Sequence, residues 1–291
     1  MISFIQDSVS NFGEYLRPKE KIMENSTQYP PRRALITGGA SGVGLGVAQA
    51  LLEKGAYVAI ADVDRVRLQK VTQEFGNPKI LPIEMDVRSP ASVKAGVDAC
   101  KKAFGEIDTL VNAAGIIRYQ LYQEITEKDW DDILDVNLKG VFLCCQAASP
   151  LLCESGRGRI VNIGSDASRV GFAYHTHYCA SKHGVVGLSK ALVGQLAPYN
   201  VTVNCVLPVN IPETGMGQEI LRWKINATGQ TAETIIKAGF EAIPLGRNAT
   251  VADIVNAIMF FIADESSFIT GVALDIDGGA AAFIGTAGAS S

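Results

Sequence analysis

Two side chains that could transfer a proton, Tyr178 and Lys182, lie four residues apart in the sequence. In a helix this spacing places both side chains on the same face, one turn apart. A free phenol titrates near pH ~10, but an adjacent cation favours the phenolate and lowers the pKa. The pair could therefore act as a general acid and base near neutral pH, although the same spacing also occurs in helices with an exposed Tyr and a solvated Lys.

A glycine-rich segment supplies the second chemical signal. The apolar stretch 34–36 leads into Thr37-Gly38-Gly39-Ala40-Ser41-Gly42-Val43-Gly44, and an apolar helix follows to residue 52. Small residues in such a turn let the backbone approach a pyrophosphate, and the N-terminus of the helix offers it free N–H groups. The order strand, glycine turn, helix predicts a dinucleotide site that includes Gly38, Ser41, Gly42, Val43 and Gly44.

The strand expected at 57–61 is followed by Asp62 and Val63. An acidic side chain here, roughly 20 residues beyond the glycines, can bind both ribose hydroxyls of NAD and repel the 2′-phosphate of NADP. No Lys or Arg lies within the glycine turn, although Arg65 follows closely. The sequence therefore predicts NAD as the cofactor, with a helix N-cap as the alternative role for Asp62.

Two further strand ends carry candidate cofactor contacts. Asp86 and Val87 follow the strand expected at 80–84. Asp86 could accept a hydrogen bond from the adenine amino group or cap the helix that begins near Pro90. The strand expected at 109–111 ends in Asn112, Ala113, Ala114 and Gly115. Because ligands of open parallel sheets bind at such carboxyl ends, we expect both segments to contact the cofactor.

These segments belong to a regular alternation of strands and helices from Arg33 onward. Further strands are expected at 159–163, 201–206 and 272–276, with helices between them. Such alternation predicts an α/β fold, a doubly wound Rossmann-type parallel β-sheet with helices on both faces. The expected organisation is an N-terminal extension over 1–31, a single Rossmann-type domain over 32–280 and a C-terminal tail over 281–291.

Two segments stand apart from this alternation. Residues 212–246 are helical in pattern and directly follow a strand, which predicts a lid over a substrate site. In the N-terminal extension, Ile2, Ile5, Val9, Phe12 and Leu16 form an apolar stripe on an expected helix. We expect this stripe to pack on the parent domain or a sister subunit, with a membrane-surface or partner-binding role as the alternative.

Composition narrows the class of protein. Lys and Arg total 26 against 30 Asp and Glu, a net charge of −4 that argues against a nucleic-acid or polybasic membrane surface. No apolar run approaches the ~18 residues of a membrane span. The six Cys form no C-x-x-C and only three His are present. We therefore expect no metal site, and mostly buried, reduced thiols in a cytoplasmic compartment.

The motifs and their order together resemble the short-chain dehydrogenase/reductase family in its single-domain form. The resemblance covers about residues 33–279, most of the chain. It rests on the glycine turn, Asn112-Ala113-Ala114-Gly115, Asn137, Ser165 thirteen residues before Tyr178, Tyr178-x-x-x-Lys182, and the segments 244–247 and 275–279. Each motif alone is a weak or moderate signal, whereas all of them in this order are a strong one.

The resemblance implies four catalytic residues. Tyr178 would give or take the hydroxyl proton, while Lys182 would lower the pKa of Tyr178 and hold the nicotinamide ribose. Ser165 would hydrogen-bond the substrate oxygen and stabilise the charge that develops there. Asn137 would hold a helix kink and a water that relays the proton toward Lys182. The cofactor contacts would further include Tyr178, Lys182, Pro208, Asn210 and Ile211.

The segment after the sixth strand departs from the family pattern. The family has Pro-Gly there, whereas this chain has Pro208-Val209, which adds bulk near the nicotinamide. The Thr expected five residues past that Pro is replaced by Glu213, and Thr214 follows one position later. The sequence leaves open which residue takes the contact of that Thr with the nicotinamide amide.

The expected wall of the substrate pocket mixes polar and apolar residues. Its candidates outside the lid are Ile117, Arg118, Asp166, Ser168, Tyr174, His175, His177 and Asn210. Met216, Leu221 and Trp223 add apolar surface from the lid. For each of the two histidines, a surface or helix-capping role is the simpler interpretation.

The leading hypothesis is an NAD(H)-dependent oxidoreductase that interconverts a secondary alcohol and a ketone, with a polyol, cyclic alcohol or hydroxysteroid as substrate. One alternative is a 3-oxoacyl-[acyl-carrier-protein] reductase, whose usual NADPH preference conflicts with Asp62. The other is a non-catalytic NAD-binding regulator, which would not need the catalytic set. By resemblance we expect a homo-oligomer, a dimer or tetramer, that acts on a small molecule. We also expect that it binds no nucleic acid and is not an integral membrane protein.

Overall fold

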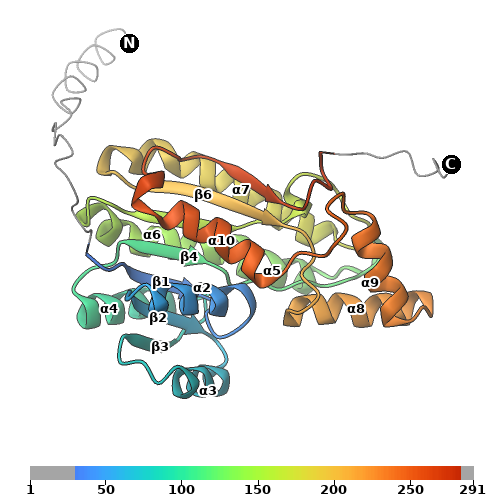
Figure 1. Ribbon diagram of the computed structural model, residues 1–291, viewed down its shortest axis with the longest axis horizontal. Helices are drawn as coiled ribbons and strands as arrows, with labels where there is room; N and C mark the ends of the chain where they lie inside the picture. The colour runs from blue at the N-terminus through green and yellow to red at the C-terminus, as the bar shows by residue number, and fades with distance from the viewer. Residues whose placement is uncertain (1–29, 283–291) are drawn as a thin grey trace, which may run out of the picture. The chain divides into compact units, whose positions relative to one another are not determined.

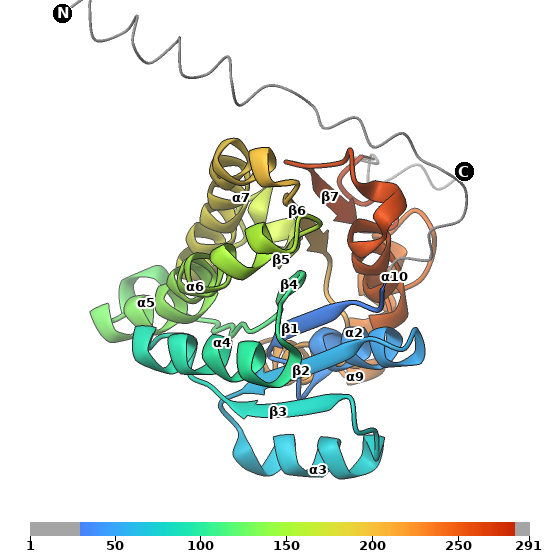
Figure 2. The same ribbon diagram turned by 90° about the vertical axis from the view of Figure 1, so that its left-hand side faces the viewer.

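A parallel sheet of seven strands, in the order β3-β2-β1-β4-β5-β6-β7, lies at the centre of the computed structural model, which describes residues 30–282 (Figures 1 and 2). The apolar stripe expected between residues 2 and 16 lies outside these residues. The strands are β1 (Arg33–Thr37), β2 (Tyr57–Asp62), β3 (Ile80–Glu84), β4 (Thr109–Asn112), β5 (Arg159–Ile163), β6 (Thr202–Pro208) and β7 (Ala273–Ile276).

Helices connect the strands and cover both faces of the sheet. The α-helices are α2 (Gly42–Glu53), α3 (Arg65–Phe75), α4 (Pro90–Phe104), α5 (Glu127–Leu134), α6 (Gly140–Glu154), α7 (Thr176–Leu196), α8 (Gly215–Thr228), α9 (Ala232–Glu241) and α10 (Val251–Ile262). A π-helical segment, Asp135–Lys139, joins α5 to α6. Short 3-10 helices are η1 (Tyr122–Glu124), η3 (Asp166–Ser168), η4 (Ala197–Tyr199) and η5 (Asp264–Ser266). The predicted α/β fold is therefore confirmed.

The hydrophobic core has two layers, one on each face of the sheet. Leu35 and Leu110 belong to the layer under α4, α6 and α7, whereas their neighbours Ile36 and Val111 belong to the layer under α2 and α10. Figure 2 shows these two groups of helices on opposite sides of the strands. Because side chains alternate along a strand and both faces are buried, the strands are apolar throughout rather than at every second residue.

The strands agree with the sequence prediction except at their ends. Residues 80–84 form β3 as predicted, but β6 continues two residues past the predicted end at residue 206, to Pro208. The extension follows from pairing, because β7 lies alongside with Pro208 opposite Ile276. Pairing with a neighbour that is distant in sequence is not visible in the local pattern.

The helical stretch from Glu127 to Glu154 is, by length and composition, long and apolar enough to cross a membrane. The sequence prediction overlooked it because Asn137 and Lys139 interrupt the apolar run. Within the fold this stretch is a core helix, since Val141, Cys144 and Leu152 are buried against the sheet.

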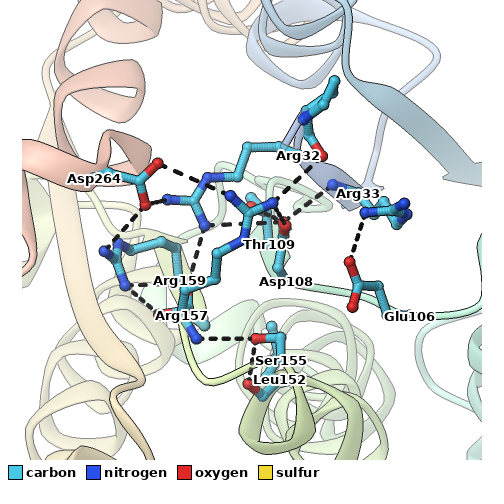
Figure 3. Close-up of polar contacts among 12 residues, drawn as sticks. Arg32, Arg33, Glu106, Asp108, Thr109, Leu152, Ser155, Arg157, Arg159 and Asp264 are labelled. Atoms are coloured by element: carbon cyan, nitrogen blue, oxygen red, sulfur yellow. Dashed lines mark hydrogen bonds and ion pairs between the residues drawn. The ribbon is translucent and has the colours of Figure 1, made fainter. Parts of the chain in front are cut away.

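An arginine–aspartate cluster closes the amino-terminal edge of the sheet (Figure 3). Asp108 is fully buried and accepts hydrogen bonds from the Arg33 backbone N–H, the Thr109 hydroxyl and the Arg157 guanidinium. Asp264, which follows α10, accepts a hydrogen bond from Arg32 and lies 3.7 Å from the Arg159 guanidinium. The cluster thus ties β1, β4 and β5 to the end of α10.

The carboxyl-terminal edge is open, and the order of the strands explains why. The chain runs outward from β1 to β3 and then crosses back to β4, so β1 has β2 on one side and β4 on the other. The connections that follow these two strands diverge and leave a crevice, which is where open sheets bind their ligands. Helices α8 and α9 lie beyond the same edge (Figure 1).

Candidate active site

A cavity of about 1080 Å³ occupies the crevice at the carboxyl ends of the strands. Its volume slightly exceeds the ~300–1,000 Å³ of typical ligand pockets. Of the eighteen predicted cofactor contacts, the cavity is lined by Gly38, Ser41, Gly42, Val43, Gly44, Asp62, Val63, Asp86, Val87, Ala113, Ala114, Gly115, Tyr178, Lys182, Pro208, Asn210 and Ile211. One site therefore brings together segments that are up to about 170 residues apart in sequence.

The glycine turn between β1 and α2 has the shape of a phosphate cradle. A Cβ atom on Gly44 would lie 2.3 Å from the carbonyl oxygen of Gly38, and one on Gly38 would lie 2.8 Å from the Ala114 nitrogen. Ser41, the N-cap residue of α2, makes no side-chain capping hydrogen bond. Because the first N–H groups of a helix have no intrahelical partner, this end of α2 is free to receive an anion.

Asn112 is the one predicted cofactor contact that does not line the cavity. Its side chain is buried in the sheet, where Nδ2 donates a hydrogen bond of 2.8 Å to Asn162 Oδ1 of the adjacent strand β5. The prediction was wrong because Asn112 is still part of β4, and alternation along the strand directs its side chain into the core layer. The residues that follow it approach the cavity instead.

The carboxylate of Asp62 at the end of β2 does not cap a helix. Its Oδ1 accepts a hydrogen bond from the Asp64 N–H, and Asp64 itself is the N-cap of α3. Asp86, at the end of β3, is likewise not the cap of α4, because Ser89 takes that place. Arg88 hydrogen-bonds both carboxylate oxygens of Asp86 and thereby lowers the pKa of that carboxyl.

Two arginines near these carboxylates line the cavity, and the sequence analysis identified neither of them. Arg67 lies 3.3 Å from Asp64 on the first turn of α3, and Arg88 is held by Asp86. Arg65, which the sequence suggested, is 3.9 Å from Glu84 and does not line the cavity. Arg65 and Arg67 are two residues apart on α3 and therefore point in different directions. Which of them faces the cavity depends on where the helix begins, and the structure fixes this start because Asp64 is the N-cap.

Tyr178 and Lys182 lie side by side in the first turns of α7, as their spacing predicts. Both side chains are buried, and the Lys182 Nζ atom is 5.6 Å from the centre of the Tyr178 ring. Nζ also donates a hydrogen bond of 2.8 Å to the carbonyl oxygen of Ile163 at the end of β5. This hydrogen bond fixes the ammonium group between the helix and the sheet.

Burial dominates the electrostatics of this pair. It raises the pKa of Tyr178 well above its ordinary value, which the hydrogen bond with Ser165 only partly offsets. Burial also lowers the pKa of Lys182 to about 8. The expected depression of the Tyr178 pKa is thus not seen in the protein alone, because both groups lose hydration when they charge. At neutral pH the pair is a phenol beside a largely protonated amine.

Asn137 lies in the π-helical segment between α5 and α6 and clamps the loop after β4. Its Oδ1 accepts a hydrogen bond from the Ile116 N–H, and its Nδ2 donates to the Ile116 carbonyl, each at 2.9 Å. Nδ2 also lies 3.2 Å from the Ser181 hydroxyl of α7. The side chain is fully buried. Because the helix widens locally at this π-helical segment, the Asn137 amide reaches both the loop after β4 and helix α7.

Ser165 follows β5 and is the N-cap of η3. Its hydroxyl donates a hydrogen bond of 2.6 Å to Asp166 Oδ1 and accepts one from the Ala167 N–H. Both Ser165 and Asp166 line the cavity beside Tyr178. The structure thus brings together all four predicted catalytic residues.

The wall of the substrate pocket differs from the prediction at three positions. His177 is fully buried and points away, since its Nε2 is 3.1 Å from Gln120 and its Nδ1 accepts the Tyr178 N–H. Arg118 is held by two aspartates of α5, and the Ser168 hydroxyl donates to the Lys182 carbonyl. Ile117, Asp166, Tyr174, His175 and Asn210 do line the cavity.

The lid consists of α8 and α9, as the helical pattern of residues 212–246 predicts. Met216 and Trp223 of α8 line the cavity, and the Met216 sulfur is 4.0 Å from the Tyr178 hydroxyl. Leu221 instead faces a second cavity bounded by α8 and α9.

At the start of α8, Thr214 rather than Glu213 faces the cavity. This residue is the N-cap of α8 and lines the cavity, with its Cγ2 near the glycine turn at Gly42. Glu213 points away, and its carboxylate accepts a hydrogen bond from the Val251 N–H at the start of α10. Val209 lines the cavity where the family pattern has Gly.

The model of the short chain dehydrogenase family matches residues 32–225. This chain belongs to that family. It is an oxidoreductase of the short-chain type that acts on small molecules, and the glycine turn, Ser165, Tyr178 and Lys182 of the family pattern line the cavity described above.

Comparison with known proteins agrees with this assignment. The chain is 38% identical to a D-threitol dehydrogenase of Mycolicibacterium smegmatis over 84% of this chain and 91% of the relative. It is 34% identical to an NAD-dependent glycerol dehydrogenase of Listeria innocua over 84% of this chain and 92% of the relative. Other relatives at similar identity include 3-oxoacyl-[acyl-carrier-protein] reductases.

The fold also matches solved structures of the family. The structure of a variant actinorhodin polyketide ketoreductase with NADPH superposes with a TM-score of 0.82 at 31% sequence identity. The match covers 87% of this chain and 98% of that chain. Relatives thus include NAD- and NADP-dependent members, and the glycine cradle and free end of α2 fit either dinucleotide.

A cluster of four ring side chains lines the cavity, and the sequence predicted only some of them. Tyr119 stacks on Trp223 of the lid with ring centres 4.3 Å apart, and His175 meets Tyr119 edge-on at 3.8 Å. Tyr174, which has a φ of 66°, lies 5.2 Å from the same Trp. The sequence singled out Trp223, Tyr174 and His175 but missed Tyr119, the next residue after Arg118 on the loop that follows β4.

Proposed function

We propose that this chain is an NAD-dependent oxidoreductase that interconverts a secondary alcohol and a ketone, with Tyr178 as the general acid and base. One observation carries the proposal. A single cavity extends from the glycine turn, past Asp62, to Tyr178, Lys182 and Ser165. Groups suited to bind phosphate, to bind a ribose and to transfer a proton therefore share one continuous space.

In the proposed reaction Tyr178 moves the proton and Ser165 holds the substrate oxygen. The nicotinamide, when bound, supplies or accepts the hydride. In ketone reduction, the Tyr178 phenol donates its proton to the substrate oxygen. The Ser165 hydroxyl turns its single hydrogen from Asp166 Oδ1 to the same oxygen and stabilises the charge that develops there. In alcohol oxidation, Tyr178 accepts the proton instead.

Lys182 and Asn137 support this proton transfer. Because burial raises the pKa of Tyr178, a nearby positive charge is needed to stabilise its phenolate, and Lys182 is the cation one helical turn away. We assign Lys182 the additional role of holding the nicotinamide ribose. Asn137 fixes the loop after β4 against α7, and we assign it the water that relays protons toward Lys182.

The choice of NAD rests on Asp62. Its carboxylate lines the cavity at the end of β2 and is not used to cap a helix. A negative charge there binds ribose hydroxyls and repels a 2′-phosphate. The two nearby cations in the cavity, Arg67 and Arg88, lie against Asp64 and Asp86, which reduces their availability to a phosphate.

A small polyhydroxylated or cyclic alcohol is the substrate class that we favour. The cavity wall carries acceptors in Asp166, Glu219 and Asn210 beside the four ring side chains. Two relatives are named for threitol and glycerol, both polyols.

We further propose a cytoplasmic homo-oligomer, a dimer or tetramer. Size-exclusion chromatography with light scattering would test the oligomeric state.

The proposed function is tested by turnover with NAD and NADP in parallel. Secondary alcohols and polyols are added to the purified protein, and reduced nicotinamide is followed by absorbance. We expect NAD to support turnover and Tyr178→Phe to lower it by about 10²–10⁴-fold, the usual loss when an acid–base group is removed. The matched control is Tyr199→Phe on η4, an exposed site outside the cavity.

Two outcomes would contradict the proposal. Preference for NADP would show that the role assigned to Asp62 is wrong. Tight binding of NADH without turnover of any alcohol or ketone would instead favour a non-catalytic regulator.

One observation favours a second candidate, a 3-oxoacyl-[acyl-carrier-protein] reductase. A second cavity of about 710 Å³ adjoins the first and has an apolar wall that includes Ile220, Leu221, Ile235 and Ile236. An acyl chain could occupy such a space. This candidate predicts efficient NADPH-dependent reduction of a 3-oxoacyl thioester, which the same absorbance assay measures.

A further inference from the structure

The side chain of Asp166 lies where the two cavities meet. It lines both of them, and it directly follows Ser165 in the sequence. Tyr178 is close enough that its phenolate would be destabilised by the Asp166 charge. Negative charge develops on the substrate oxygen during the proposed reaction, and a carboxylate beside it would repel that charge and slow the reaction. A hydrogen-bond donor bound to the carboxylate would reduce this repulsion.

The two oxygens of the Asp166 carboxylate differ in their environment. Oδ1 accepts hydrogen bonds from the Ser165 hydroxyl at 2.6 Å and from the Ala167 N–H at 2.8 Å. Oδ2 makes no hydrogen bond to any residue in the described range 30–282, and it is not one of the fully enclosed polar atoms of that range. One oxygen thus holds the turn together, while the other is open to the cavity.

Among residues 30–282 no cation forms an ion pair with this carboxylate, although Lys224 of α8 also lines both cavities. Arg169 is directed at Asp275 and the Ala273 carbonyl of β7, and Lys182 donates to the Ile163 carbonyl. Burial raises the pKa of the Asp166 carboxyl, and the charge of Asp277 adds to this effect. A half-buried carboxylate without a cation costs free energy, which a hydrogen-bond donor from a ligand would offset.

We propose that Asp166 Oδ2 binds a second hydroxyl of the substrate, on the carbon next to the reacting carbinol, so that the enzyme selects vicinal diols. The inference rests on the proposed function and names the substrate class of the same site. Ser165 and Asp166 are consecutive and hydrogen-bonded to each other, so two hydroxyls on neighbouring carbons can reach one residue each.

The same geometry disfavours a 3-oxoacyl substrate. Both oxygens of a 3-oxoacyl thioester are carbonyl acceptors, and neither can donate a hydrogen bond to a carboxylate. Burial raises the pKa of the Asp166 carboxyl, whereas the hydrogen bonds from Ser165 and Ala167 to Oδ1 act in the opposite direction and favour the ionised form. An acceptor that faces another acceptor leaves both unpaired.

Two alcohols that differ by one hydroxyl test the inference. The stereoisomers of 2,3-butanediol are compared with the enantiomers of 2-butanol as substrates of the full chain with NAD. We expect kcat/KM for the best diol to exceed that for the best mono-alcohol by about 10- to 100-fold, the value of a hydrogen bond to a charged group. In Asp166→Ala this ratio should fall to within about 3-fold of unity because the acceptor is gone.

The ratio separates recognition from positioning. If Asp166 only orients Ser165, its removal lowers both rates equally and leaves the ratio unchanged, which would overturn the inference. Asp166→Asn keeps an acceptor for Ser165 and serves as the second variant if the alanine variant does not fold. Asp275→Ala, which removes a paired carboxylate of the second cavity, is the matched control and should preserve the ratio.

The outcomes also distinguish this inference from the proposed function. Turnover of 2-butanol that depends on Tyr178, with no preference for the diol in the wild type, would leave the function standing and overturn the inference. Turnover of neither alcohol, together with no reduction of acetoin or butanone, would overturn the function and the inference with it.

Discussion

At the amino-terminal edge of the sheet Asp108 is enclosed by donors, whereas at the carboxyl-terminal edge Asp62 and Asp166 each have an oxygen that no residue in the described range 30–282 hydrogen-bonds. The first edge is closed by arginines that link β1, β4, β5 and the end of α10 (Figure 3). The second edge is open to a cavity of about 1080 Å³. The same residue type therefore links strands at one edge and, in the functions that we propose, binds ligand at the other.

The comparison shows where unsatisfied polar groups are tolerated in this fold. The free end of α2, the open carboxylates and the buried Tyr178–Lys182 pair all raise the free energy of the ligand-free protein. They lie on a sheet whose two faces carry buried hydrophobic layers and whose opposite edge is held by the arginine–aspartate cluster. Packing remote from the site thus supports the strain that binding and chemistry require.

Breaking the closed edge should have the largest effect on stability. Asp108→Ala removes a fully buried carboxylate and leaves arginines without its charge. We expect a loss of about 3–5 kcal/mol in the free energy of unfolding, the usual cost of breaking a buried ion pair. Urea unfolding measures the loss, and kcat of the protein that remains folded should be preserved.

Glu106→Ala is the matched control at the same edge. The Glu106 side chain is 41% exposed and, among residues 30–282, pairs only with Arg33, so its removal should cost at most about 1 kcal/mol. Equal losses for the two variants would show that the buried cluster does not stabilise this edge.

A side chain added in the glycine turn should weaken cofactor binding at the open edge of the sheet and have little effect on the arginine–aspartate cluster at the other edge. In Gly44→Ala the new methyl would lie 2.3 Å from the Gly38 carbonyl, so the turn must move. A shift of about 1 Å in a binding site commonly costs about 10²-fold, and we expect a loss of that size in NADH affinity, measured by fluorescence titration. Gly194→Ala on α7, where nothing lies within 4 Å of the new methyl, should bind NADH normally.

Removing the open carboxylate of β2 should change the choice of cofactor. In Asp62→Ser the charge that repels a 2′-phosphate is lost, and Arg67 and Arg88 line the same cavity. We expect the ratio of kcat/KM for NAD over NADP to fall by about 10- to 100-fold, or about 1.4–2.7 kcal/mol. Glu84→Gln at the end of the neighbouring strand removes a charge outside the cavity, and an equal change there would refute the assignment.

The buried cysteines in the core layer under α4, α6 and α7 should make the free energy of unfolding depend on pH above about pH 8. Burial raises the pKa of Cys100 and Cys145 to about 12 each and that of Cys205 to about 11. Because the unfolded thiols titrate near ~8.5, the native state holds more protons above that pH and stability falls as pH rises. Each thiol contributes up to about 1.4 kcal/mol per pH unit between ~8.5 and its native pKa.

The measurement is thermal unfolding between pH 8 and pH 10, with Cys145→Ala beside the wild type. The variant should lose part of the pH dependence even though its stability at pH 7 is lower. Lys182 acts in the opposite direction in this range, because its native pKa of about 8 lies below that of an unfolded lysine. An unchanged slope in the variant would contradict buried, protonated thiols.

Several features of this protein follow from the sequence alone because their causes are local. The glycine turn requires residues without a Cβ atom at Gly38 and Gly44, and the spacing of Tyr178 and Lys182 fixes their common helix face. The alternation of strands and helices determines the parallel sheet and hence the edge at which ligands bind. These signals were sufficient to predict residues that lie together in the structure, since all but one of the predicted cofactor contacts line the same cavity.

Only the tertiary structure decided which side chains near a strand end face the cavity. Asn112 and His177 turn into the core although their neighbours Ala113 and Tyr178 line the site. Thr214 rather than Glu213 faces the glycine turn, because the start of α10 takes the glutamate. The same is true of Asp166, whose two oxygens differ only through contacts made in the fold. Side-chain direction at the end of an element depends on neighbours that are distant in sequence, and no local pattern records them.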